Sequence, residues 1–241
     1  MALQPIEILN GILSLIFVII STYIGLRIAS KYLKHKQITL ILVGISWIGV
    51  SSLWIAPSIS IVLALSTGEG LTPFMYFFIA NALIPFYLFI WITAITEFMY
   101  KDKQKIILLI TAIIGTIVEI LFLYLLFTDI GAIGELSGPV DTDWGLFMTV
   151  YYLLVIVIMV ITGTLFGRES LKSDNPETKL KGKFILAAFY IWLLGCLFDT
   201  LSAISIMVLV MARILLIISS LLFYLGFILP DSVKKQYLKI D

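Results

Sequence analysis

The sequence contains very little cysteine or histidine, with one residue of each among 241. One cysteine excludes a disulfide within the chain, so Cys196 is expected to be a small buried apolar residue. The one histidine, His35, lies between two lysines and is expected to be solvated. Zinc sites need several Cys or His at fixed spacing, and no Ser–His or Cys–His nucleophile can form inside an apolar segment here. We therefore expect neither a metal site nor an enzyme.

Charged residues are also scarce, at 13% of the chain, whereas hydrophobic residues make up 61%. Soluble domains usually carry about 25% charged residues, so most of this chain is expected to lie in lipid. A membrane-spanning helix needs roughly 20 mainly apolar residues. The sequence therefore predicts an all-α fold, a single domain over residues 1–241, in which seven transmembrane helices form an integral membrane bundle. The predicted spans are approximately 6–29, 38–65, 73–99, 105–127, 146–167, 183–204 and 208–229.

The start of the first span, the turn between the last two spans and the segment 128–145 are less clearly marked in the sequence than the spans themselves. The first span has neither the positive start nor the small-residue cleavage site of a signal peptide, so it is expected to be retained. Residues 184–229 as one helix would be about 69 Å long, roughly twice the hydrocarbon thickness, so a turn is predicted near residues 202–207. Segment 128–145 shows no apolar periodicity and is expected to be a plain connector, with a lid over an external site as the alternative.

The distribution of basic residues predicts the orientation. If the chain crosses seven times, fifteen of the 16 Lys and Arg fall on one side, and the segments on the other side contain none. The positive-inside rule makes the basic side cytoplasmic, so the N-terminus is outside, in a multi-pass protein of the cell membrane. The basic segments would face anionic membrane lipid or an acidic cytoplasmic protein partner, and they do not indicate nucleic acid. The fifteen residues are Arg27, Lys31, Lys34, Lys36, Lys101, Lys103, Lys105, Arg168, Lys172, Lys179, Lys181, Lys183, Lys234, Lys235 and Lys239.

Polar residues deep inside apolar spans are the candidates for a ligand-binding site. Glu119, Asp199, Arg213 and Asn81 come from four different spans, and each lies about 10–12 Å below the outer edge at 1.5 Å per residue. The same depth includes Ser14, Ser58, Tyr151 and Tyr152. Two carboxylates against one guanidinium would suit a small cationic or zwitterionic ligand, or a proton, entering from outside. The alternative is a structural lock, in which Asp199 and Arg213 pair and fix the last two helices.

Three further residues inside the spans have structural interpretations. Glu97 is close to the inner end of its span and is expected to reach the interface or to pair with Lys101, four residues later. Pro57 and Pro85 are each expected to kink their helices, because proline removes a backbone donor and crowds the preceding turn. The kinked helices would be the moving parts of a receptor.

The layout is similar to that of microbial rhodopsins, but no lysine lies in the interior of a span, which excludes a retinal Schiff base and leaves no cofactor to expect. The chain also resembles the seven-helix sensor regions that begin some prokaryotic membrane histidine kinases. This resemblance covers the overall plan and the exit of the last helix through Leu225-Gly226-Phe227-Ile228-Leu229-Pro230. Such regions lead into a signalling domain, whereas eleven residues follow Pro230 here, so a separate cytoplasmic partner is expected. The preference for Lys over Arg and the many Ile residues indicate a prokaryotic composition.

The leading functional prediction is a receptor-like or sensor-like membrane protein with a polar pocket in the outer half of the bundle. A small transporter or proton-coupled carrier would use the same acidic residues. A structural subunit of a larger membrane complex would need no pocket at all. These three classes stay open at the level of the sequence.

Overall fold

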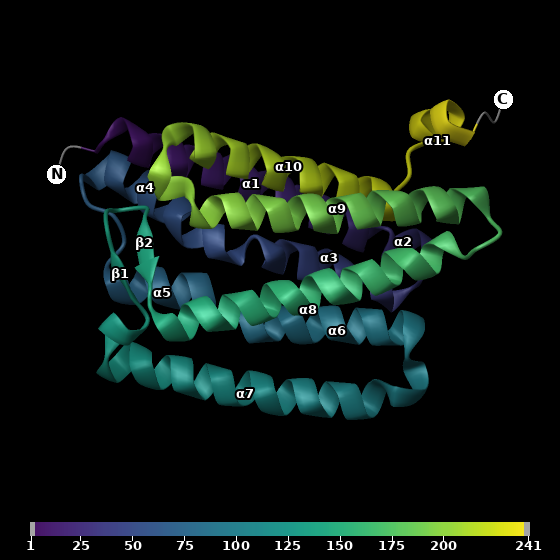
Figure 1. Cartoon of the computed structure of the whole chain (residues 1–241), viewed down its shortest axis with the longest axis horizontal. Helices are drawn as coiled ribbons and strands as arrows, with labels where there is room; N and C mark the ends of the chain where they lie inside the picture. Colours follow the sequence, from purple (N-terminus) through teal and green to yellow (C-terminus); the bar gives the residue numbers. More distant parts are fainter. Residues whose placement is uncertain (1–2, 239–241) are drawn as a thin grey trace. The chain divides into compact units, whose positions relative to one another are not determined.

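The computed structural model of the chain describes residues 3–238 and is almost wholly helical (Figure 1). Lys239, counted above among the basic residues, lies outside the described residues. The elements are α1 (Pro5–Ser30), α2 (Tyr32–His35), α3 (Ile38–Val50), η1 (Ser52–Trp54), α4 (Ile55–Thr67), α5 (Pro73–Asn81), α6 (Ile84–Met99), η2 (Lys101–Lys103), α7 (Gln104–Thr128), η3 (Ile130–Ala132), β1 (Gly134–Leu136), β2 (Thr142–Trp144), α8 (Leu146–Leu171), α9 (Pro176–Thr200), η4 (Ser202–Ile204), α10 (Ile206–Phe227) and α11 (Asp231–Leu238).

The described residues contain six helices that are long and apolar enough to cross a membrane. A seventh span results if the bent pair Ile38–Val50 and Ser52–Thr67 is counted as one. The predicted all-α class is therefore confirmed. The helices could cross a membrane as the predicted multi-pass plan requires, and the number seven depends on that pair. The six are Pro5–His35, Pro73–Met99, Lys101–Thr128, Leu146–Leu171, Pro176–Thr200 and Ile206–Phe227.

The chain divides into two compact units, residues 1–154 and residues 155–241. In the first unit α1 packs against α3 and α4, α3 packs against α6, and α6 packs against α7. Helices α1 and α3 come unusually close, since a Cβ placed on Gly25 would lie 2.5 Å from the backbone oxygen of Gly44. The single domain expected from the sequence stays a prediction.

The second unit is built around α9 and α10, which lie side by side (Figure 1). A Cβ on Gly195 would lie 2.9 Å from Leu216 Cδ2, so glycine allows the two helices to pack closely at this point. Helix α9 ends at Thr200, η4 forms the turn, and α10 begins at Ile206. The turn predicted near residues 202–207 is confirmed.

Two spans are broken, each close to a proline. Residues 51–54 separate α3 from α4, with a bend of 41°, and residues 82–83 separate α5 from α6. The kink predicted at Pro57 is confirmed, and at Pro85 the structure shows an interrupted helix. Each interruption lies N-terminal to its proline. The reason is that proline disturbs the residue four positions earlier, whose carbonyl loses its helical donor and meets the ring.

Segment 128–145 is more ordered than a plain connector, and that expectation is wrong. Strands β1 and β2 pair antiparallel, with Glu135 opposite Asp143. A hydrogen bond of 2.8 Å from Gly145 N to Ile133 O extends the pairing beyond the strands. Gly134 has φ of +158°, and a Cβ there would lie 2.6 Å from the Asp143 oxygen, so the close approach of the strands requires glycine.

Candidate functional site

Each compact unit contains two of the four predicted site residues. Asn81 and Glu119 belong to the first unit, and Asp199 and Arg213 belong to the second. Asn81 is joined to Tyr152, and Asp199 is joined to Arg213. Each unit therefore has its own polar contact.

Asn81 is the last residue of α5 and is 2% exposed. Its Nδ2 donates to the Phe77 oxygen at 2.8 Å, and its Oδ1 accepts a hydrogen bond from the Tyr152 hydroxyl. The second bond joins positions 71 residues apart and ties the broken span α5–α6 to α8. Pro85 has no N–H to offer the Asn81 carbonyl. Asn81 thus combines a buried amide side chain with an interrupted backbone.

Glu119 belongs to the one stripe of α7 that faces the protein. Further along this stripe Phe122 and Leu126 are buried, at 2% and 3% exposure. Towards the start of the helix Gly115 lies opposite Pro85, and Gln104 Nε2 donates to the Thr96 hydroxyl at 3.2 Å. The spacing of 104, 115, 119, 122 and 126 keeps these residues on one helical face. Glu119 is therefore directed inward from a helix whose other faces are apolar and exposed.

The Glu119 carboxylate interacts electrostatically with the phenol of Tyr151 of α8. The Tyr151 hydroxyl is buried and has no hydrogen-bond partner among residues 3–238. Over the same residues no Lys or Arg forms a salt bridge with Glu119. The Glu119 carboxylate and the buried Tyr151 hydroxyl could therefore both bind a further group.

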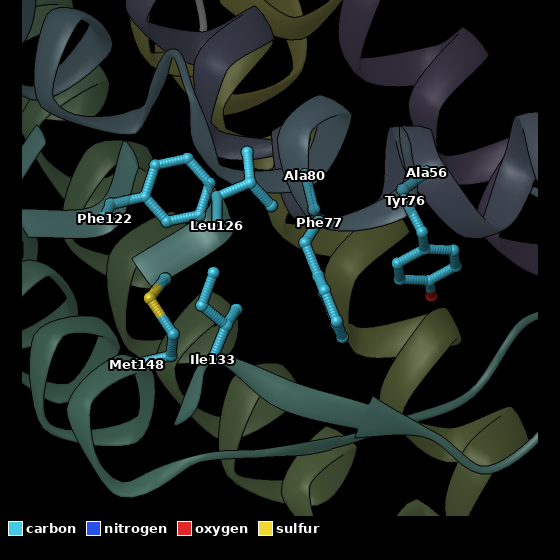
Figure 2. Packing of buried hydrophobic residues seen from close by; sticks show 8 residues of the cluster. All are labelled: Ala56, Tyr76, Phe77, Ala80, Phe122, Leu126, Ile133 and Met148. Carbon is cyan, nitrogen blue, oxygen red and sulfur yellow. The ribbon is translucent and has the colours of Figure 1, made fainter. Parts of the chain in front are cut away.

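Aromatic rings pack beside Tyr151 and Tyr152. Trp144 meets the ring of Tyr152 edge to face at 5.1 Å and an interplanar angle of 88°, and it lies 5.6 Å from the ring of Phe77. The rings of Tyr151 and Tyr152 are 6.2 Å apart. These rings pack against a buried cluster drawn in Figure 2. Its members are Ala56, Tyr76, Phe77, Ala80, Phe122, Leu126, Ile133 and Met148.

The hairpin is fixed to the first unit by buried polar contacts. The Tyr76 hydroxyl donates to the Val140 oxygen at 3.2 Å. Ser60, which is fully buried, donates to the Pro139 oxygen and accepts a hydrogen bond from Leu71 N at 2.9 Å. The hairpin therefore covers the aromatic cluster instead of moving freely.

In the second unit Arg213 Nη1 donates to the Asp199 carboxylate, which joins α10 to α9 beside the turn. The Arg213 side chain is 4% exposed and the Asp199 side chain 24%. This pair is the contact predicted for a structural lock. Cys196, three residues before Asp199, is buried as expected.

The structure also bears on the remaining polar residues that the sequence analysis considered. Glu97 pairs with Lys101 at 2.6 Å, and His35 is exposed, both as predicted. Among the described residues no group of three or more His, Cys, Asp or Glu is placed to hold a metal. Ser60, Tyr76 and Trp144 were not predicted as part of the site. Ser60 and Tyr76 bond to a loop whose fold the sequence pattern does not reveal, and Trp144 lies in that loop.

No protein-family model, curated protein or solved structure matches this chain. The resemblance to the sensor regions of membrane histidine kinases stays a prediction. The function is therefore argued from the chemistry of the site.

Proposed function

We propose that this chain is a receptor-like or sensor-like multi-pass membrane protein that binds a small cation in the outer half of its first unit. The observation that carries the proposal is Glu119, an inward-facing carboxylate in an apolar helix with no salt bridge among the described residues. A charged side chain at the centre of a span costs roughly 2.5–3.5 kcal/mol on insertion scales. A proton or a bound cation would remove that cost.

The neighbouring groups favour a cation over a zwitterion. Arg213, a basic residue buried deep within its span, already pairs with Asp199. The anionic end of a zwitterion would need a donor of similar strength, and the polar side chain that interacts with Glu119 is the phenol of Tyr151. Aromatic faces such as those of Tyr151 and Tyr152 attract ammonium groups through their quadrupoles. A carboxylate beside several aromatic rings is therefore suited to a small organic ammonium ion.

A route for the response follows from the elements that meet at the site. The Asn81–Tyr152 hydrogen bond couples the break in α5–α6 to α8. Helix α8 begins beside the site and extends past residue 155 into the second unit. A cation bound at Glu119 and Tyr151 would change the packing at the start of α8. We propose the N-terminus outside and the C-terminus in the cytoplasm, with the basic segments facing anionic lipid or a cytoplasmic protein partner.

The test is thermal unfolding of the purified protein with tetramethylammonium chloride as the probe and sodium chloride as the matched salt. A ligand that binds only the folded state stabilises it by mass action. We expect tetramethylammonium to raise the Tm of the wild type and of Glu135→Gln, a control on the exposed hairpin, but not of Glu119→Gln. Equal shifts in all three proteins would refute a cation site at Glu119.

A transporter is the second candidate, and the two broken helices favour it. Discontinuous helices commonly form substrate and ion sites near the midplane of transporters. Proteoliposomes loaded with radiolabelled tetramethylammonium separate the two classes. Net flux that Glu119→Gln abolishes would identify a carrier, whereas binding without flux would support a receptor. Native mass spectrometry that finds a protein partner and no small molecule would instead favour a structural subunit.

A further inference from the structure

Helix α11 lies against the first turns of α9 in the second unit. It follows α10 after a break at residues 228–230 and begins at Asp231. Lys234 Nζ of α11 lies 3.0 Å from Glu177 Oε2 of α9. The ring of Tyr237 meets the ring of Phe184 edge to face, with centroids 6.1 Å apart. One ionic and one aromatic contact therefore hold this short helix.

Both contacts use the same face of α9. Positions 177, 181 and 184 are spaced by four and then three residues, so they form one stripe. Lys181 on this stripe binds the other carboxylate oxygen of Glu177, at 2.8 Å. Glu177 is thus shared between a lysine of its own helix and a lysine of α11. Glu177 is the acidic residue on which docking of α11 depends.

The end of α10 is fixed, but α11 itself is held weakly. A Cβ on Gly226 would lie 2.5 Å from Ile185 Cγ1, so α10 and α9 are in close contact just before the break. Beyond the break, the side chains of Lys234 and Glu177 remain 28% and 32% exposed. An eight-residue helix is too short to persist by itself in water. Its conformation therefore depends on a surface to lie on.

The charge of this region is complementary to an anionic membrane surface. Residues 167–183 and 230–238 carry seven Lys and Arg against four Asp and Glu. Four of the seven are exposed and form no salt bridge within residues 3–238: Arg168, Lys179, Lys183 and Lys235. Each basic residue near an anionic leaflet strengthens binding roughly fivefold. Tyr237, which is 59% exposed, is a residue type favoured at the membrane interface.

We propose that α11 is a reversible surface helix, docked on α9 through Glu177, and that anionic phospholipid headgroups compete with Glu177 for its lysines. In the docked state Glu177 neutralises Lys234 and Lys181. In the released state α11 lies on the leaflet, and the stripe from Glu177 to Phe184 becomes accessible. The proposal rests on the cytoplasmic orientation proposed above and is independent of the ligand site at Glu119.

The test is a distance measurement by double electron–electron resonance in the full chain. Spin labels are attached at Ser173→Cys and Gln236→Cys in a Cys196→Ser background, and the protein is placed in nanodiscs. In phosphatidylcholine we expect one narrow distance distribution for the wild type and for Asp174→Asn, which removes a nearby exposed acid. Glu177→Gln should broaden the distribution. The exchange Glu177→Lys with Lys234→Glu should restore it, because one acid again lies between two lysines.

The competition is tested in nanodiscs of equimolar phosphatidylcholine and phosphatidylserine. We expect the wild-type distribution to shift toward that of Glu177→Gln and to return when salt screens the lipid charge. A Glu177→Gln distribution as narrow as that of Asp174→Asn would overturn the docking role of Glu177. A wild-type distribution that is the same in both lipids would overturn the competition with the leaflet.

Discussion

Helices α1 and α3 offer a perturbation whose effect can be worked out from backbone geometry. Gly25→Ala places a Cβ 2.5 Å from the Gly44 backbone oxygen and 2.6 Å from Ile48 Cγ1. The backbone oxygen cannot rotate away, so the two helices must separate. Gly115→Ala in α7 is the matched control, because its Cβ would lie 3.4 Å from Pro85 Cβ, an ordinary contact.

The two substitutions should change stability in opposite directions. Alanine improves helix propensity by about 1 kcal/mol at both positions. At Gly25 the new contact falls roughly 0.9 Å short of ordinary van der Waals separation, and overpacking of this kind costs about 1–3 kcal/mol. Because a backbone atom is involved, we expect the upper part of that range and a net loss of about 2 kcal/mol. Gly115→Ala should be neutral or should gain up to about 1 kcal/mol.

Thermal unfolding in one detergent measures both variants against the wild type. A loss of about 2 kcal/mol corresponds to a fall in Tm of roughly 4–8 °C for a chain of this size. A Gly25→Ala protein as stable as Gly115→Ala would show that α1 and α3 do not approach through Gly25. The reasoning about their close packing would then be wrong.

Three further predictions concern the polar contacts. Ser60→Ala leaves a backbone N–H and a carbonyl unsatisfied and should cost about 1–3 kcal/mol, with faster proteolysis of the hairpin; unchanged proteolysis would contradict its anchoring role. Asp199→Leu and Arg213→Met should each destabilise the protein more than the double replacement Asp199→Leu with Arg213→Met. We expect a coupling energy of at least about 1 kcal/mol in this double-mutant cycle, whereas additive losses would refute a lock. Tyr152→Phe removes the hydroxyl that donates to Asn81 and should cost about 1 kcal/mol in chemical unfolding, so a more stable variant would argue against this bond.

The membrane spans could be predicted from the sequence because lipid leaves the backbone few alternatives. Every buried N–H and C=O must bond within the segment, so a long apolar segment is a helix. Counting residues from the outer edge also placed Asn81 and Tyr152 at one depth. It placed Asp199 and Arg213 in the same layer. Each pair is joined in the structure.

The grouping of these residues could not be predicted, because depth gives no information on helix rotation. The sequence assigned Asp199 and Glu119 to one predicted pocket, and the structure shows that Asp199 forms an ion pair with Arg213 within the second unit. The hairpin was missed for another reason. Its strands have three residues each, which is too short for an alternating pattern to be recognised. The contact between the ring of Trp144, at the end of this hairpin, and the ring of Tyr152 was therefore not predicted.

The contrast between the two acidic residues is the strongest argument for a functional site near Glu119. Asp199 and Arg213 meet on neighbouring helices, and removing either one leaves the charge of the other without this ion pair. Glu119 has a phenol and aromatic rings beside it in place of a basic partner. A membrane helix gains nothing in packing from an unbalanced carboxylate, since leucine at the same position would be more stable in lipid. If Glu119→Leu stabilises the protein and abolishes tetramethylammonium binding, the carboxylate is retained for binding at the expense of stability. A Glu119→Leu protein that is less stable than the wild type would instead make Glu119 part of the structural framework.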